Sequence, residues 1–174
     1  MADPPDGIVL RRHRDLVGRT WHPWVRRGVL VLLGVILLLA LLDVFGQRPT
    51  TVITDSPAAR LELSSPSSVR GGLMFQARFT IRAHRDLKAA TLVLGEGWLE
   101  NMTVNTIEPT PVNEASDDGK LSLELGHIPA GRKYVLFIQF QVNPTNVGRR
   151  EQTAVLRDGD EQLLTYEKTI TVYP

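Results

Sequence analysis

Residues 28–42 read GVLVLLGVILLLALL, fifteen residues without a charge or a side-chain hydrogen-bonding group. A helix rises about 1.5 Å per residue, so this run alone spans about 22 Å, less than a hydrocarbon core of about 30 Å. The flanks extend it to Trp24 on one side and to Phe45 and Gly46 on the other. A soluble helix normally has a polar face, and this run has none. We therefore predict one transmembrane helix over residues 24–46.

The residues just before the run suit a bilayer surface. Trp21 and Trp24 have the amphipathic rings that concentrate at the headgroup level. The stems of Arg26 and Arg27 can lie in hydrocarbon while their charged heads reach the interface. We expect these four residues to anchor the helix in the lipid bilayer.

The charges on the two sides of the helix predict its orientation. Residues 11–27 hold six arginines against one acid, whereas residues 46–62 hold two arginines against two acids. The more basic side stays in the cytoplasm, so residues 1–23 are expected to form a cytoplasmic tail and the remainder to lie outside the plasma membrane. A cleaved signal peptide is the alternative. No small-x-small cleavage site follows Leu42 directly, which favours an uncleaved, single-pass signal anchor.

The composition restricts the chemistry of the outer part. The chain has no cysteine, which excludes disulfides, thiol catalysis and thiolate metal sites. Residues 51–174 contain thirteen Lys and Arg against fifteen Asp and Glu. This balance gives no basic footprint for nucleic acid, so no nucleic-acid partner is predicted. An outer domain without disulfides suits a bacterial envelope.

Alternating apolar and polar residues predict strands in the outer part. Leu73, Phe75, Ala77, Phe79 and Ile81 share one face of such a segment, and polar residues fill the other. Residues 134–142 form the most apolar segment, which we place centrally. About eight such strands separated by Gly, Pro, Asn and Asp turns are typical of an immunoglobulin-like antiparallel β-sandwich. We predict an all-β fold over residues 59–174 after a linker at 47–58; a small closed barrel is the alternative.

Two further segments carry specific expectations. Residues 98–107 are expected to form a strand, with Met102 and Val104 pointing inward. Residues 108–120 contain prolines, asparagine, aspartates and glycine, which predicts a loop.

A turn of the form G-x-I-x-A-G, here Gly126-His127-Ile128-Pro129-Ala130-Gly131, leads into the long apolar segment. The chain then passes through a turn at 143–148 and a DGD hairpin to a last strand ending in ITVYP at 170–174. This arrangement resembles bacterial Ig-like adhesion and cell-surface domains of the CARDB or NEW3 type. The whole chain resembles small actinobacterial single-pass membrane proteins with one anchor and such an outer domain. The resemblance implies a binding or spacer role and brings no functional residues with it.

The sequence assembles no catalytic centre. There is no G-x-S-x-G nucleophile motif, and the outer histidines His84 and His127 lie in separate predicted turns without zinc-ligand spacing. Asp158 and Asp160 could hold Ca²⁺, but a charged hairpin tip is the simpler interpretation. We therefore predict no catalytic residue, no metal site and no cofactor, and a protein that is not an enzyme.

Two functions remain open at this stage. The first is a non-enzymatic, membrane-anchored extracytoplasmic interaction module, an accessory subunit of another envelope or multi-pass membrane protein. Asp43 at the outer end of the helix is a candidate contact, because it could pair with a basic group of a membrane partner. The alternative is a cell-wall or glycan-binding sandwich. That function needs exposed aromatic residues, and the candidates are Trp98, Tyr134, Tyr166 and Tyr173, of which Tyr134 is expected in the core.

Overall fold

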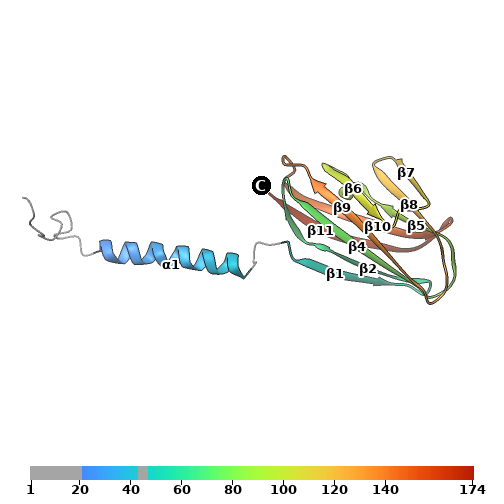
Figure 1. The fold of residues 1–174 in the computed structure, drawn as a ribbon, viewed down its shortest axis with the longest axis horizontal. Helices are drawn as coiled ribbons and strands as arrows, with labels where there is room; N and C mark the ends of the chain where they lie inside the picture. Colours follow the sequence, from blue (N-terminus) through green and yellow to red (C-terminus); the bar gives the residue numbers. More distant parts are fainter. Residues whose placement is uncertain (1–20, 43–46) are drawn as a thin grey trace, which may run out of the picture. The chain divides into compact units, whose positions relative to one another are not determined.

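The computed structural model describes residues 21–42 and 47–174, which fall into two units, one helix and one β-sandwich (Figure 1). The helix, α1, runs from His22 to Leu41, with Pro23 in its first turn and no buried residue. An 18-residue window of this helix has a mean hydropathy of 2.2, and the helix is long and apolar enough to cross a membrane. The apolar helix near the N-terminus is thereby confirmed. It begins two residues before the predicted Trp24, and the predicted end falls on residues 43–46, outside the described part.

The second unit is built from strands and one short 3-10 helix. The strands are β1 (Pro49–Asp55), β2 (Ala59–Pro66), β3 (Ser68–Arg70), β4 (Met74–Ala83), β5 (Leu87–Leu94), β6 (Met102–Glu108), β7 (Asn113–Asp117), β8 (Lys120–Ile128), β9 (Lys133–Val142), β10 (Gly148–Asp158) and β11 (Glu161–Tyr173), and the 3-10 helix is η2 (Glu96–Trp98).

These strands form two sheets that pack face to face (Figure 1). The first sheet has the order β1-β2-β4-β9-β6, and the second has the order β3-β11-β10-β5-β8-β7. The strand pairs are antiparallel, apart from the short parallel pair of β3 with β11. The predicted all-β sandwich is confirmed, with more strands than the sequence pattern indicated.

The core lies between the sheets and follows the predicted alternation. Phe75, Ala77, Phe79 and Ile81 of β4 all point inward and are buried. Strand β9 occupies an interior position between β4 and β6, as expected for the most apolar segment. Leu73 departs from the pattern, because it precedes β4 and is 49% exposed.

Trp98 is part of this core. It is fully buried, with its ring centroid 5.5 Å from that of Phe79 and 5.1 Å from that of Phe140. The sequence predicted the start of a strand here, but the chain forms η2 instead and the strand begins at Met102. A Cβ at Gly97 would lie 1.9 Å from the Glu151 carbonyl oxygen, so the close approach of η2 to β10 requires glycine.

Two segments predicted to be irregular are strands. Residues 47–58, expected as a linker, contain β1, which pairs with β2 over its whole length. Residues 108–120, expected as a loop, contain β7, which forms a hairpin with β8. Both are edge strands with mostly exposed side chains, so neither shows the apolar alternation that marks a half-buried strand. Tertiary pairing, rather than local pattern, makes them strands.

Candidate functional site

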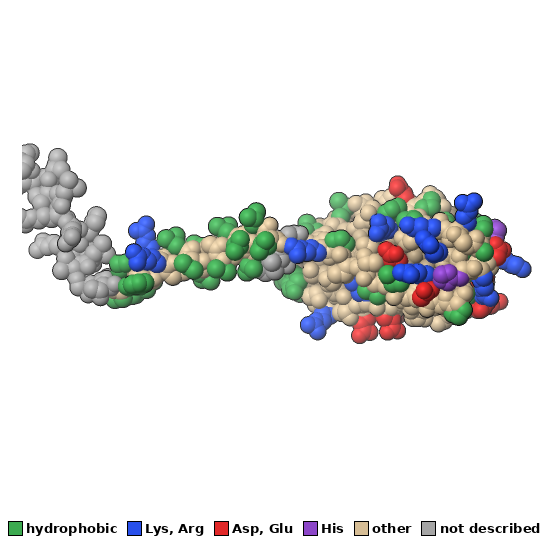
Figure 2. All heavy atoms as spheres, turned by 90° about the horizontal axis from the view of Figure 1, so that it is seen from below, with side chains coloured by type: hydrophobic (Ala, Val, Ile, Leu, Met, Phe, Trp, Pro, Cys, Tyr) green, Lys and Arg blue, Asp and Glu red, His purple; other side chains and the backbone are tan. Residues whose placement is uncertain are grey.

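Three of the four predicted anchoring residues share one turn of α1, and Trp21 directly precedes the helix. Trp21 and Trp24 are 60% and 70% exposed, and the Arg27 guanidinium lies 5.3 Å from the centroid of the Trp24 ring. Arg26 is exposed as well. A cation above an indole keeps the charge beside an amphipathic ring. Figure 2 shows hydrophobic side chains along the helix. Asp43, the predicted partner contact, lies outside the described residues.

The outer face of the first sheet carries a row of charged side chains. Strand register places Asp55 of β1 opposite Arg60 of β2, Arg60 opposite Arg82 of β4, and Arg82 opposite Lys133 of β9. Four neighbouring strands therefore line up one acid and three bases. We call Arg60, Arg82 and Lys133 the basic row. Sequence reasoning missed it, because the three residues belong to separate strands and only pairing aligns them.

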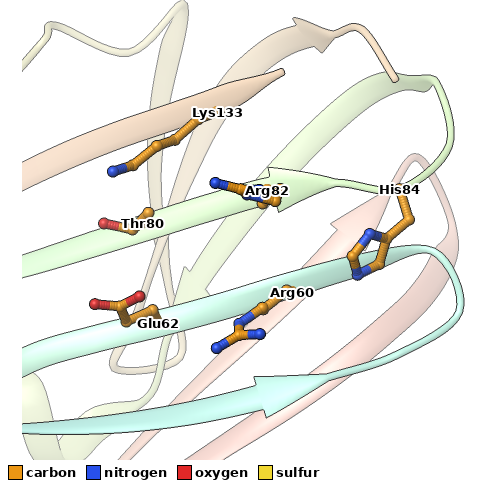
Figure 3. Close-up of a pocket in the computed structure, with 6 residues that line it drawn as sticks. All are labelled: Arg60, Glu62, Thr80, Arg82, His84 and Lys133. Carbon is orange, nitrogen blue, oxygen red and sulfur yellow. The ribbon is translucent and has the colours of Figure 1, made fainter. Parts of the chain in front are cut away.

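A hollow of about 340 Å³ opens beside the basic row and is lined by Arg60, Glu62, Thr80, Arg82, His84 and Lys133 (Figure 3). Figure 3 shows the Arg82 and Lys133 side chains extending in the same direction along neighbouring strands, toward Thr80. Thr80 is only 8% exposed although it lies on the outer face. Thr80 and Glu62 are cross-strand partners. The floor of the hollow thus offers a hydroxyl and a carboxylate among three cations.

The acid at the end of the row is already engaged. The Asp55 carboxylate accepts a hydrogen bond from the His84 ring nitrogen Nε2 at 2.9 Å. This hydrogen bond is the main reason why the pKa of Asp55 lies below its ordinary value; desolvation opposes it, and the charges of His84 and Arg60 add to it. Asp55 is therefore an ionised partner of His84 that also faces Arg60.

Apolar side chains lie beside the charges on the same face. Ile53, Glu62, Thr80 and Val135 form the next cross-strand row, in which Ile53 is 47% exposed. Phe137, two residues further along β9, is 36% exposed. Figure 2 shows such a mixture of basic, acidic, histidine and hydrophobic side chains on the visible face of the sandwich. The face combines charge with exposed apolar surface.

Two strands leave backbone groups unpaired at the sheet edges. The backbone N–H of Ser56 donates a hydrogen bond to the Ala59 carbonyl oxygen. Along an antiparallel ladder, hydrogen-bonded residue pairs alternate with pairs that are not hydrogen-bonded to each other. Thr51, Ile53 and Asp55 of β1 therefore direct their N–H and C=O groups to the free edge. In the second sheet β11 pairs with β10 along its length, but with β3 only at Thr171–Tyr173. In the described sandwich, β11 therefore has no second strand partner over residues 161–170.

The aromatic residues considered for glycan binding are mostly inside. Trp98 and Tyr166 are fully buried, and burial raises the pKa of Tyr166 to about 12. Tyr134 is half-buried, as expected for a core residue, and desolvation raises its pKa as well. Tyr173, at the end of β11, is 58% exposed.

The residues considered for catalysis or metal binding are used in separate pairs. His84 pairs with Asp55, and the His127 ring nitrogen Nε2 lies 2.9 Å from the Asp86 carboxylate. The Asp158 carboxylate accepts a hydrogen bond from the backbone N–H of Ala89 at 2.8 Å. In residues 21–42 and 47–174, no group of three or more His, Asp or Glu side chains lies close enough together to hold a metal ion.

No protein-family model and no curated protein matches this chain. Among solved structures, the solution structure of CaCohA2 from Clostridium acetobutylicum is 14% identical with a TM-score of 0.48, covering 68% of this chain and 93% of that one. A crystal structure of a CaDoc0917–CaCohA2 complex is also 14% identical, with a TM-score of 0.43, covering 60% of this chain and 93% of that one. At these values no property of those proteins is carried over to this one.

Proposed function

We propose that this protein is a single-pass, membrane-anchored module whose outer β-sandwich binds another membrane or envelope protein without catalysing a reaction. Two observations together carry the proposal. None of the 20 residues of α1 is buried, and the sandwich forms a second compact unit. Exposing the apolar surface of such a helix to water is unfavourable in free energy, whereas the hydrocarbon core of a bilayer would cover that surface.

The charges around the helix support an N-terminus in the cytoplasm and a sandwich outside the plasma membrane. Six arginines fall within residues 11–27, and such an excess stays on the cytoplasmic side. Trp24 and Arg27, stacked at the start of α1, are the kind of pair that would hold this end at the headgroups.

The outer face of the first sheet supports a protein partner. Arginine and aromatic side chains are enriched in protein interfaces, and here Arg60, Arg82 and Phe137 share one face with Ile53 and Val135. The free edge of β1 and the free edge of β11 offer a second mode, in which a partner strand adds by backbone hydrogen bonds. Both modes would bind a partner without catalysing a reaction.

Because most of its aromatic residues are buried, the sandwich is better suited to binding protein than to binding glycan. Sugars stack on exposed aromatic rings, and Trp98 and Tyr166 are buried in the core. Among the described residues of the sandwich, Tyr173 at 58% and Phe137 at 36% are the exposed large aromatics. They belong to different sheets, so they do not form one stacking platform.

The proposal is tested by extracting the full-length protein in mild detergent and measuring its mass. It should migrate in a complex larger than itself plus micelle, and mass spectrometry should find a membrane or envelope protein with it. The matched control carries an unrelated transmembrane helix in place of residues 22–42. A monomeric protein that keeps its cellular function with this substituted anchor would contradict a membrane partner.

Asp43 is tested in the same extracts. If it pairs with a basic group of a transmembrane partner, Asp43→Asn should weaken the complex while the circular dichroism of the sandwich stays unchanged. An unaltered complex would leave the sandwich alone as the binding element.

A further inference from the structure

The basic row places like charges directly opposite one another. Arg60 faces Arg82, and Arg82 faces Lys133, on three adjacent strands. Directly opposed like charges on one face of a sheet are destabilising. The free protein therefore carries an unfavourable interaction at this place, and a bound anion would relieve it.

The chain's own acids leave this charge largely uncompensated. Within residues 21–42 and 47–174, the side chains of Arg82 and Lys133 make no hydrogen bond or ion pair. Glu62 lines the same hollow without forming an ion pair in that part of the chain. Asp55 is held by His84. The hollow thus presents three cations against one carboxylate in its lining.

We infer that this hollow is the docking site for an acidic side chain, Asp or Glu, of the protein partner; the inference rests on the proposed function and names the chemistry of its recognition. A guanidinium presents a planar fork of donors that matches a carboxylate. Arg82 and Lys133 extend side by side and supply the charge, and the nearly buried Thr80 hydroxyl supplies a neutral donor. The Glu62 carboxylate accepts a hydrogen bond from a partner group next to the docked acidic side chain, for example a backbone N–H.

The size of the hollow fits one side chain. Small-molecule sites span about 300–1,000 Å³, and this hollow of about 340 Å³ lies at the lower end. It therefore accommodates a single carboxylate side chain and the adjoining backbone.

The surroundings favour an acidic protein segment over an anionic polymer. A polyanion needs a continuous track of cations, and here Asp55 ends the row and Glu62 interrupts the next one. Ile53 and Phe137 add exposed apolar surface on the same face, which a polyphosphate would leave uncovered. A peptide strand can satisfy the charges and cover the apolar residues together.

The test uses the full-length protein in a neutral detergent. The probe is a fluorescein-labelled peptide repeating Glu-Thr-Val, and its control peptide has Gln in place of Glu. Fluorescence anisotropy should show binding of the acidic peptide, weaker binding at high salt, and none of the control. In the double variant Arg82→Gln, Lys133→Gln the affinity should fall about tenfold or more, because charge-assisted hydrogen bonds are lost. Lys88→Gln, an exposed position on the second sheet, should leave affinity unchanged.

The double variant is checked by thermal unfolding. Removing opposed like charges should leave its melting temperature equal to or above that of the wild type, so weak binding cannot be ascribed to unfolding. Equal binding of the acidic peptide to wild type and double variant, no binding to the wild type, or binding of polyphosphate in its place would each overturn the inference. A native complex that persists in the double variant would also overturn it while leaving the proposed function intact; a monomeric wild type would refute the proposed function itself.

Discussion

The Lys168 ammonium group donates hydrogen bonds to the Ser65 carbonyl oxygen at 2.6 Å and to the Ser65 hydroxyl at 2.9 Å. A third hydrogen bond reaches the Pro66 carbonyl oxygen at 3.2 Å. Lys168 belongs to β11 of the second sheet and Ser65 to β2 of the first, so one side chain joins the two sheets of the sandwich. No carboxylate is among these partners, and burial lowers the pKa of Lys168 to about 8.

This lowered pKa predicts a pH dependence of stability. The pKa of lysine in the unfolded chain is 10.5 and that of folded Lys168 is about 8, so between these values the unfolded chain binds more protons. The free energy of unfolding should therefore rise with pH through this window. Urea titrations should show that the unfolding free energy of the wild type, minus that of Lys168→Met, increases as the pH rises from about 8 to 10.5.

The comparison with Lys168→Met cancels other titrating groups. Tyr134 and Tyr166 have raised pKa values and act in the opposite direction at high pH, but equally in both proteins. A difference between the two proteins that stays flat from neutral pH to the upper end of the window would contradict a desolvated Lys168.

The aromatic core should be sensitive to truncation. Phe79 and Phe140 are fully buried and lie against Trp98. Phe79→Ala and Phe140→Ala should each reduce the free energy of unfolding by about 3–5 kcal/mol, the sum of lost burial and a residual cavity. Phe137→Ala, a partly exposed position on β9 next to these residues in the sheet, should cost less than either. Chemical denaturation measures all three, and similar losses at Phe137 and Phe140 would mean that the faces of β9 are reversed.

Gln152 offers a stabilising substitution. Its side chain is fully buried on β10, and neither its amide nitrogen nor its oxygen has a hydrogen-bond partner in the described residues. Gln152→Met keeps the length of the side chain and removes both polar groups, so the free energy of unfolding should increase by about 1 kcal/mol. The matched change Gln141→Met, at an exposed position, should have almost no effect. A clear loss of stability in Gln152→Met would show that the amide is hydrogen-bonded through buried water.

The boundary of the folded unit should lie before β1. A fragment of residues 47–174 keeps β1 and should fold alone, with a circular dichroism spectrum dominated by strands. A fragment of residues 59–174 lacks the partner of β2 and would expose a new sheet edge, which favours self-association. We expect a lower urea midpoint and concentration-dependent light scattering for the shorter fragment. Identical behaviour of the two fragments would reinstate the linker that the sequence suggested.

The orientation in the membrane is open to direct measurement. Protease added to intact spheroplasts should digest the C-terminal sandwich and spare a tag on the N-terminus, because the arginines before α1 favour the cytoplasm. Replacing Arg26 and Arg27 by Glu should increase the fraction with the opposite orientation. A protected C-terminus would refute this orientation, and a mature protein beginning near Gln47 would refute the uncleaved anchor.

Local patterns in the sequence were sufficient for α1, for the inward face of β4 and for the interior place of β9 in its sheet. The run at 28–42 and the alternation around Phe79 are periodic features of neighbouring residues, and their period alone selects helix or strand. Such patterns work where an element has an apolar side to bury. They failed at Leu73, because the alternation continues one step past the point where the sheet covers it.

Only the tertiary structure decided what has no local pattern. β1 and β7 are strands because a neighbour offers backbone hydrogen bonds, although their side chains stay exposed. Trp98 is core because η2 lies against β10. Arg60, Arg82 and Lys133 become one row, and Lys168 reaches Ser65, through register and sheet packing between residues distant in the chain. For the basic row and for the Lys168–Ser65 contact, the partners lie far apart in the chain, so no sequence window of a few residues contains both.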